Sequence, residues 1–210
     1  MGIGIREAFS MSIRLYAENL VHSFGEKKVF SGISLSADEG EIIAVTGRNG
    51  SGKSTLCRIL AGLLEPSGGG VILSDGENIL PRSPSGNISF ISPDLRWYDE
   101  LTARENLSFF MRDREGYERA ESLAEKFRIA ESLDEKVGVF SSGMRQRLSL
   151  AAFFAIPSML RILDEPAAHL DDEGRYIFLE LLTRSERCVT VLVSHDWNEL
   201  SRAQRRITLA

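Results

Sequence analysis

The segment at residues 46–55, TGRNGSGKST, constrains the fold of this chain more than any other, because it joins two segments of different character. The apolar run at 42–45 predicts a buried strand before it, and helical spacing from 53 to 64 predicts a helix after it. Its glycines allow positive φ angles, so that successive backbone N–H groups can converge on a small anion. The segment therefore predicts a phosphate-binding loop between a strand and a helix.

The pattern Gly47-x-x-x-x-Gly52-Lys53-Ser54 matches a phosphate loop in residue types as well as in context. The helix that starts near Lys53 places its positive dipole end at the loop, and the ammonium can reach β- and γ-phosphates. The hydroxyl of Ser54 can ligate Mg²⁺. The other loop residues contribute mostly backbone N–H groups: Arg48, Asn49, Gly50, Ser51 and Thr55. A glycine-rich turn without function is the alternative, and the flanking strand and helix disfavour it. The chain is predicted to bind a nucleoside triphosphate with Mg²⁺.

A second segment, MLRILDEP at 159–166, is an apolar strand that ends in two acids and a proline. Asp164 at the carboxyl end of the strand is expected beside the phosphate loop, where it can hold Mg²⁺ directly or through water. Glu165 lies beyond the strand end and can turn toward the γ-phosphate to orient or deprotonate a water molecule. An acidic turn after a buried strand is the alternative, and the phosphate loop upstream makes it the weaker one.

The rest of the chain alternates between strand and helix patterns. Residues 14–24 place Leu15, Ala17 and Leu20 between polar neighbours, as a half-buried strand does. Residues 102–133 and 142–155 have helical spacing, and strands and helices alternate from 159 to the end. A β-rich front, a helical middle and a βαβ end predict one α/β domain over 11–210, with a helical insertion at about 95–150. Residues 1–10 are expected to be an extension without a role.

Composition excludes several function classes. The 210 residues carry a net charge of −5, which does not favour bulk nucleic-acid binding. No run approaches the roughly 18 apolar residues of a membrane span, and no signal peptide is expected. Cys57 and Cys188 have no ligand spacing and are expected to be buried thiols.

The segment FSSGMRQRLSLA at 140–151 resembles the signature sequence of the ATP-binding-cassette (ABC) family, and the resemblance extends over about 13–210. Ser141, Ser142 and Gly143 open a helix whose free N–H groups can bind an anion. The resemblance implies a phosphate-loop core with a mostly parallel sheet, an N-terminal antiparallel β subdomain and an inserted helical subdomain. It also implies that this second anion site grips the γ-phosphate of ATP on the other subunit of a head-to-tail dimer.

Three further residues match family positions. Phe24 lies where the family places an aromatic ring that stacks on adenine; the alternative is a core residue at a strand end. Asp171 closes the AAHLD segment at 167–171, which in the family crosses the dimer seam. His195 matches a histidine that contacts the γ-phosphate and stabilises transition-state charge. His22 and His169 have no such partners and are expected at the surface.

One position departs from the family pattern. The glutamine that usually touches Mg²⁺ and reports nucleotide state to the membrane subunit is absent from FISPDLRWYDELT at 90–102, where Asp94 or Pro93 takes its place. Asp94, or a water molecule, is expected to replace it at the metal. Trp97 and Tyr98 follow and are equally compatible with a docking rim for a partner helix and with packing of the insertion against the core.

These observations predict a Mg²⁺-dependent ATPase subunit of a membrane transporter, most simply an exporter, in which Lys53, Glu165 and His195 act on the triphosphate. The subunit is expected to work as a homodimer or ABC heterodimer on the inner face of the cell membrane, with a separate transmembrane permease and no nucleic acid. A soluble ABC ATPase that acts on ribosomes or DNA is the alternative, disfavoured by the single cassette. A phosphate-loop kinase would leave the signature without a role.

Overall fold

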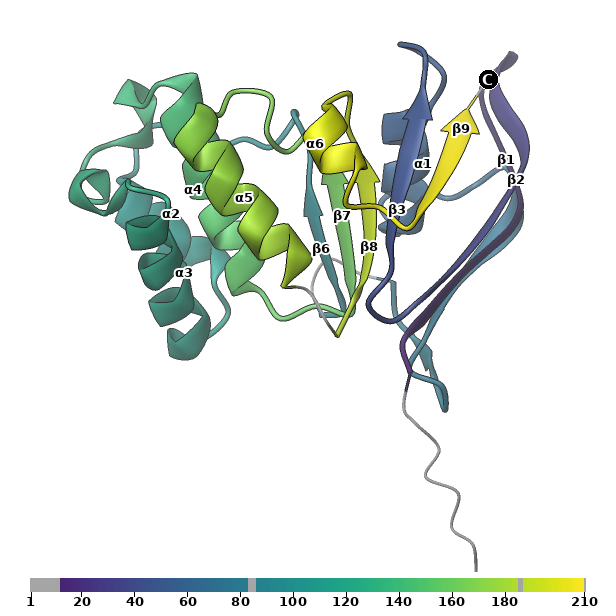
Figure 1. The fold of residues 1–210 in the computed structure, drawn as a ribbon, viewed down its shortest axis with the longest axis horizontal. Coiled ribbons are helices and arrows are strands. Elements are labelled where there is room, and N and C mark those ends of the chain that lie inside the picture. The colour runs from purple at the N-terminus through teal and green to yellow at the C-terminus, as the bar shows by residue number, and fades with distance from the viewer. Residues whose placement is uncertain (1–11, 83–85, 185–186, 210) are drawn as a thin grey trace, which may run out of the picture.

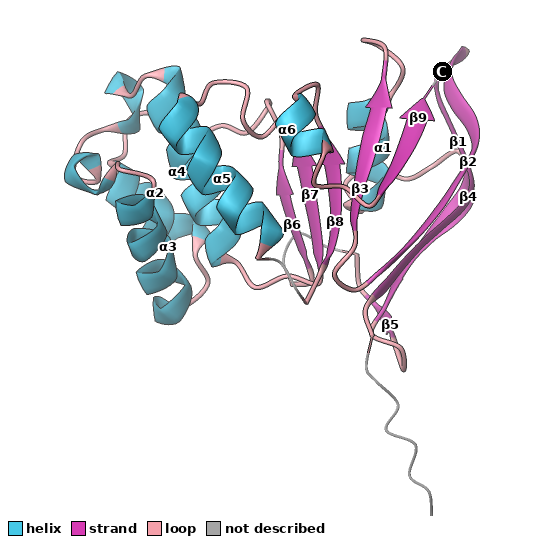
Figure 2. Ribbon diagram, in the orientation of Figure 1, coloured by secondary structure: helices cyan, strands magenta, loops and turns pink. Residues whose placement is uncertain are grey.

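The computed structural model describes residues 12–82, 86–184 and 187–209, so the predicted extension at 1–10 lies outside it. The described chain forms two sheets and a group of helices (Figure 2). The antiparallel sheet has the order β2-β1-β4-β5, with β1 Arg14–Phe24, β2 Lys27–Asp38, β4 Gly68–Ser74 and β5 Ile79–Leu80. The parallel sheet has the order β6-β7-β8-β3-β9, with β3 Ile42–Gly47, β6 Ile88–Ile91, β7 Leu160–Asp164, β8 Val189–Val193 and β9 Arg205–Leu209.

The helices are α1 Lys53–Leu60, α2 Ala103–Phe110, α3 Arg114–Lys126, α4 Ser142–Ala155, α5 Asp172–Thr183 and α6 Trp197–Leu200. The elements predicted at 14–24 and 142–155 have the same bounds in the structure, and the helix predicted from 53 to 64 ends earlier, at Leu60. The α/β class with an antiparallel sheet beside a mostly parallel one is confirmed.

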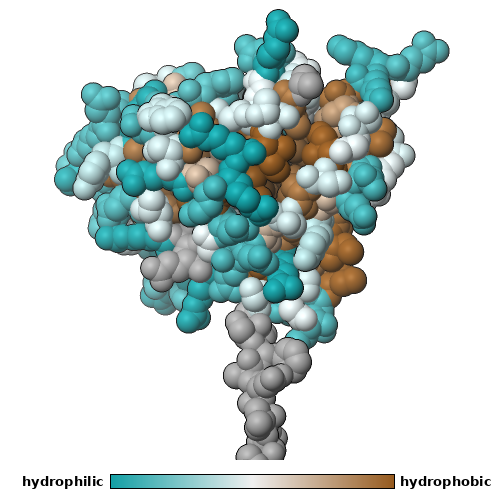
Figure 3. Space-filling model, turned by 45° about the vertical axis from the view of Figure 1, so that its right-hand side comes forward, coloured by the Kyte–Doolittle hydropathy of each residue, from teal (hydrophilic) through white to brown (hydrophobic). Residues whose placement is uncertain are grey.

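Two cores lie on opposite faces of the parallel sheet, because successive side chains of a strand point to opposite faces. Ile43 and Val45 of β3 belong to the core that contains α1 and the antiparallel sheet. Ile42 belongs to the other core, which is built largely from α2 to α5. Figure 1 shows this division, with α2 to α5 on the left of the parallel sheet and α1 and the antiparallel sheet on the right. Figure 3, turned by 45° from this view, shows hydrophobic residues gathered right of the centre of that face. The parallel sheet is therefore covered by different material on each face.

Strand β1 changes its inward-facing alternation partway along. Leu15 and Ala17 point inward, and so do Leu20 and His22, because the pairing with β2 shifts register around Asn19, which has φ of 49°. His22 is only 5% exposed and lies opposite Phe30. The surface prediction is therefore wrong for His22, whose place follows from the bulge, and correct for His169.

The helical middle begins at a capping box in which the Thr102 hydroxyl accepts from the backbone N–H of Glu105, and it continues to Ala155. Of the two aromatic residues before it, Trp97 packs against the core and Tyr98 remains at the surface, where a docking rim was the other expectation. Trp97 is 9% exposed, and its indole N–H donates to Ser149 Oγ of α4 at 3.0 Å, whereas Tyr98 is half exposed. Cys57 and Cys188 are both buried, as expected. No helix in the described ranges combines the length and the apolar character that crossing a bilayer requires.

Candidate functional site

A cavity of about 480 Å³ lies where the carboxyl ends of β3, β7 and β8 meet the start of α1. Ligands of open α/β sheets bind at this edge. The lining residues come from five separate parts of the sequence: Phe24, Lys27, Lys28, Val29, Asn49, Gly50, Gly52, Lys53, Ser54, Thr55, Pro93, Asp164, Glu165 and His195. Most of the residues predicted to hold the nucleotide, the metal and the attacking water thus face one space.

The phosphate loop is held close to its neighbours by its glycines. Gly52 has φ of 94°, and a Cβ there would lie 2.5 Å from Cγ1 of Val29 and 2.9 Å from Cδ1 of Phe30. Gly47 has φ of 148°, and its Cβ would lie 2.6 Å from the carbonyl oxygen of Leu209. The N-terminus of α1 has no side-chain cap, so its N–H groups remain available to an anion.

Lys53 curls back over its own loop. The residue is 8% exposed, and its ammonium donates to the carbonyl oxygens of Gly47, at 2.9 Å, and Arg48, at 3.2 Å. The loop wraps around the amine, so the positive charge sits where phosphate oxygens are expected.

The metal-binding prediction can be tested on Asp164 and Ser54. Asp164 is 3% exposed, one of its carboxylate oxygens has no hydrogen-bond partner, and its carboxylate accepts from Ser54. Burial raises the pKa of Asp164, while Ser54 and Lys53 act in the opposite direction. A buried, unpaired carboxylate oxygen beside a hydroxyl is the hard oxygen donor set that Mg²⁺ prefers. The two residues fit the metal.

Glu165 does not continue the alternation of β7, because the backbone turns at this residue. Its φ is 52°, an uncommon value for a residue other than glycine, and its N–H donates to the carbonyl of Val193 at 2.9 Å. This turn brings Glu165 Oε1 to 3.3 Å from Nε2 of His195. Burial raises the pKa of Glu165, and the nearby His195 lowers it. A carboxylate so placed can accept a proton from water.

The signature residues do not line this cavity. Ser141 caps α4 by accepting from the backbone N–H of Met144 at 3.2 Å, and Ser142 is exposed. Ser142 instead lines a separate hollow of about 410 Å³, which also reaches Glu165. Gly143 lies against the loop between β7 and α5, since a Cβ there would be 3.1 Å from the carbonyl oxygen of His169. Within one chain the signature and the phosphate loop remain apart.

Asp171 has a full set of partners in its own chain. It caps α5 through the N–H of Gly174 and accepts two hydrogen bonds from Arg147, at 2.5 and 2.7 Å. The hydrogen bond from Gly174, followed by that from Arg147, lowers its pKa. The carboxylate therefore ties α5 to the signature helix α4, and its contact with nucleotide stays a prediction.

Asp94 forms an ion pair with Arg58 of α1 and is largely exposed. Its neighbour Pro93 lines the nucleotide cavity, and Asp94 itself does not. Its proposed metal contact thus stays a prediction, and the ion pair is a partner that the sequence did not indicate.

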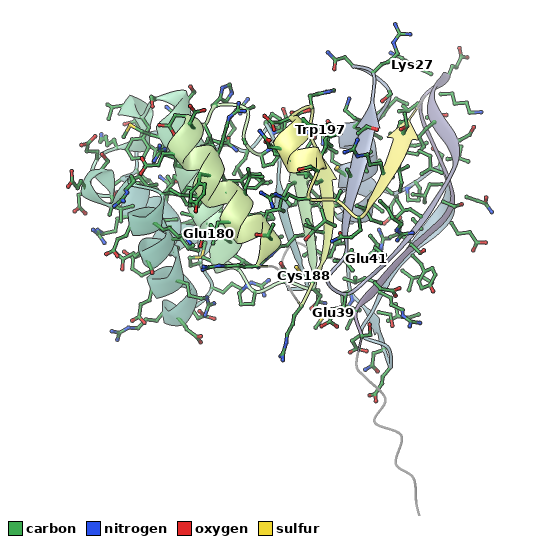
Figure 4. All side chains as sticks on the ribbon, viewed as in Figure 1. Lys27, Glu39, Glu41, Glu180, Cys188 and Trp197 are labelled. Carbon is green, nitrogen blue, oxygen red and sulfur yellow. The ribbon has the colours of Figure 1, made fainter. Side chains whose placement is uncertain are left out.

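Sequence reasoning missed Lys27, Lys28 and Val29 as cavity residues, whereas Pro93 was one of the two residues placed at the position of the family glutamine. The two lysines follow Phe24 closely in SFGEKKVF, and this proximity was the available signal. Figure 4 shows Lys27 at the turn between β1 and β2, at the upper edge of the molecule. These ammonium groups add positive charge beside Phe24, which is 54% exposed in the same cavity. The cavity mouth therefore suits an anionic ligand with an aromatic part.

Comparison with known proteins supports the interpretation of this cavity as a site for an anionic ligand with an aromatic part. The family model described as ABC transporter matches residues 30–168. The ABC transporter ATP-binding protein YdbJ of Bacillus subtilis is 33% identical over 89% of the chain, which spans 62% of that protein. The cytochrome c biogenesis ATP-binding export protein CcmA of Rhizobium meliloti is 38% identical over 81% of the chain and 84% of its own length. The zinc import ATP-binding protein ZnuC of Yersinia enterocolitica is 33% identical over 89% of the chain and 71% of its own length.

A solved structure agrees with the sequence relatives. A structure described as the ATP-binding subunit of an ABC transporter superposes with a TM-score of 0.82 at 26% identity. The superposition covers 93% of this chain and 85% of that one. Most of the described architecture, and not the phosphate loop alone, is thus shared with this subunit.

Proposed function

Because the chain belongs to the ABC transporter family, whose ATP-binding subunits are ATPases, we propose that it hydrolyses ATP to power a membrane transporter. The observation that carries this proposal is the convergence of Lys53, Asp164, Glu165 and His195 on one cavity. A triphosphate held there meets a cation, a carboxylate that can bind metal and a carboxylate that can take a proton.

Each side chain has a separate task in this proposal. Lys53 and the N–H groups at the start of α1 neutralise the phosphates, and Phe24 stacks on the base. Glu165 orients the attacking water and accepts its proton, while His195 donates to the γ-phosphate. Ser54 and Asp164 would hold Mg²⁺, which when bound offsets the negative charge of the phosphate oxygens.

The position of the signature supports a site shared between two chains. Ser142 and Gly143 open α4 outside the cavity, with backbone N–H groups at the start of a 14-residue helix. Such a helix start binds anions. We infer that a second copy, or a related subunit, presents this segment to the γ-phosphate in a head-to-tail dimer.

The membrane partner is proposed to dock on an apolar groove next to the helical middle. The groove has a volume of about 220 Å³ and is lined mainly by apolar residues: Ile88, Phe90, Ile91, Leu95, Trp97, Phe110, Met111, Ala152, Phe153 and Ile156. Phe110 of this groove is 39% exposed, and the rings of Tyr98 and Phe109, which lie against it, belong to residues that are 49% and 64% exposed. Exposed aromatic clusters of this kind are typical of interfaces. A helix of a separate permease, on the inner face of the cell membrane, is the occupant we propose.

The direction we propose is export. It is supported by the export protein of Rhizobium meliloti, which is 38% identical and covered over 84% of its length, against 33% and 71% for the zinc import protein. ATP-driven substrate uptake into inside-out membrane vesicles would support export, and uptake into right-side-out vesicles would contradict it.

Mixing two inactive variants tests the shared site. Lys53→Ala removes the phosphate-loop cation and Ser142→Arg blocks the signature, so neither protein should hydrolyse ATP alone. In a mixture, half of the random dimers are heterodimers and each contains one intact site, so ATPase activity should return. Mixing Lys53→Ala with Lys53→Arg gives no intact site and serves as the control. Absence of recovery at every ratio, although the mixed dimer forms, would contradict the proposal.

A further inference from the structure

Glu199 is a buried carboxylic acid that the proposed mechanism does not use. It lies on α6, next to the upper ends of β7 and β8 in Figure 1, and is 4% exposed. Trp197 on the same short helix is 68% exposed and points outward (Figure 4). One oxygen of the Glu199 carboxyl, Oε2, has no hydrogen-bond partner within the described part of the chain. A polar atom left unpaired in the interior is costly, so this one calls for an explanation.

The surroundings of Glu199 belong to the turn that carries His195. Glu199 is hydrogen bonded to the side chain of Ser194, which is 2% exposed and directly precedes His195. The same hydroxyl oxygen accepts from the backbone N–H of Asp196 at 2.9 Å. Ser194 thus connects the buried acid to the backbone on both sides of His195.

Asp196 fixes the other end of this turn. Its carboxylate caps α6 by accepting from the N–H groups of Asn198, at 2.7 Å, and Glu199, at 3.4 Å. Its second oxygen accepts from Arg175 of α5 at 2.7 Å. The nearby guanidinium is therefore already engaged with Asp196, and Glu199 has no ion pair with any residue that the structure describes.

The surroundings of Glu199 favour its neutral form, and together they raise its pKa to about 7. Burial is the main cause; Asp196 and Glu165 also raise the pKa, and Ser194 and Arg175 lower it. Near neutral pH a substantial part of Glu199 is protonated, so the turn can keep a buried carboxyl next to two other acids.

We propose that Glu199 is a positioning residue for His195, acting through Ser194. The inference rests on the proposed role of His195 at the γ-phosphate. His195 is itself 57% exposed and reaches Glu165 at 3.3 Å, so few contacts of its own ring fix it. The backbone of the turn must hold it, and the hydrogen bond between Glu199 and Ser194 ties that backbone to a buried side chain.

The test compares Glu199→Ala, Glu199→Gln and a control, Asn198→Ala, which changes an exposed side chain on the same helix. The first readout is the ring resonance of His195 in nucleotide-free protein, which is tractable because the chain has only three histidines. The second is the division of the effect on ATP hydrolysis between kcat and KM. Loss of positioning predicts a drop in kcat of roughly 10- to 100-fold with little change in KM.

The expected pattern is specific to a positioning role. Glu199→Ala should shift the His195 resonance and lower kcat, and Glu199→Gln, which keeps an oxygen acceptor for Ser194, should restore both. An unmoved resonance and a kcat within twofold of wild type in Glu199→Ala would overturn the inference. So would a loss in Glu199→Gln as large as that in Glu199→Ala. A wild-type protein without ATPase activity would instead contradict the proposed function, while a shifted resonance would still support the positioning of His195.

Discussion

The phosphate-loop cavity and the signature segment differ in how far one chain completes them. In the cavity, Lys53 and Asp164 are almost fully buried, and Glu165 and His195 lie within 3.3 Å of each other. At the signature, Ser142 is exposed and outside the cavity. The comparison shows that a single chain supplies the whole lining of the cavity, whereas hydrolysis in the proposed mechanism needs a surface from a second chain.

Experiments can test this difference between the cavity and the signature segment. Substitutions in the cavity should change nucleotide binding even by a single chain. Substitutions at the signature should change ATP hydrolysis only in a dimer.

The strongest challenge to the comparison is Glu165→Gln. The amide cannot accept the proton of water, so turnover should fall by about 10²- to 10⁴-fold. ATP binding should remain, because the phosphates are held by Lys53 and the backbone of the loop. Trapped ATP should then accumulate the dimer, which light scattering detects. Undiminished turnover would remove Glu165 from the role of general base.

Glu199→Gln should change how stability depends on pH. The pKa of Glu199 is raised from 4.5 to about 7 in the folded protein, so the folded state binds more protons between these values. Its contribution to stability is therefore full below about pH 4.5 and is lost as the pH rises through 7, a change of about 3 kcal/mol. Relative to wild type, the glutamine variant should gain about this much between pH 5 and 8 in urea unfolding.

A matched control separates this effect from a general one. Lys126 lowers the pKa of Glu180 through a hydrogen bond, so Glu180 is ionised in both states across pH 5 to 8. Glu180→Gln should accordingly shift stability by a constant amount over that range. Parallel pH curves for wild type and Glu199→Gln would contradict the assignment of Glu199.

Phe24→Ala tests whether the cavity recognises a base as well as phosphates. Stacking on a nucleobase contributes about 1–3 kcal/mol, so ATP affinity should fall roughly 5- to 150-fold. Affinity for tripolyphosphate, which has no base, should stay the same. Tyr16→Ala changes an exposed aromatic residue of the same strand outside this cavity and serves as the control. Equal losses for ATP and tripolyphosphate would assign Phe24 a structural role.

The smallest expected effect concerns Asp94. If Asp94 contributes to the metal, Asp94→Ala should raise the Mg²⁺ concentration needed for hydrolysis by a few fold, since exposed charges contribute about 0–1 kcal/mol. Arg58→Gln keeps the carboxylate but removes its partner, so it should lower that concentration. An unchanged Mg²⁺ dependence in Asp94→Ala would remove Asp94 from the metal site.

The parts of the site that sequence reasoning found share a physical property. Lys53, Ser54, Asp164 and Glu165 lie in short segments where residue order itself sets the geometry, such as a loop before a helix or the end of a strand. Lys27 and Lys28 reach the cavity only through the packing of β2 against other elements. No local sequence pattern specifies that packing, so these two residues were not predicted.

His22 shows how a single bulge in β1 reverses the alternation of inward and outward side chains. The alternation that starts with Leu15 and Ala17 would place position 22 outward, but the bulge around Asn19 turns it inward. Asp171 illustrates a different limit, since its hydrogen bonds from Arg147 join residues 24 positions apart in sequence. Side-chain partners at such distances depend on the tertiary structure.

The hydrogen bond between Trp97 and Ser149 has a practical consequence for optical experiments. The chain contains two tryptophans, and Trp197 is the exposed one. In a Trp197→Phe protein, the remaining emission would come from an indole that lies three residues after Asp94 and donates to the signature helix. The wavelength and intensity of this emission would report in real time whether nucleotide binding near Asp94 changes the surroundings of Trp97 beside α4.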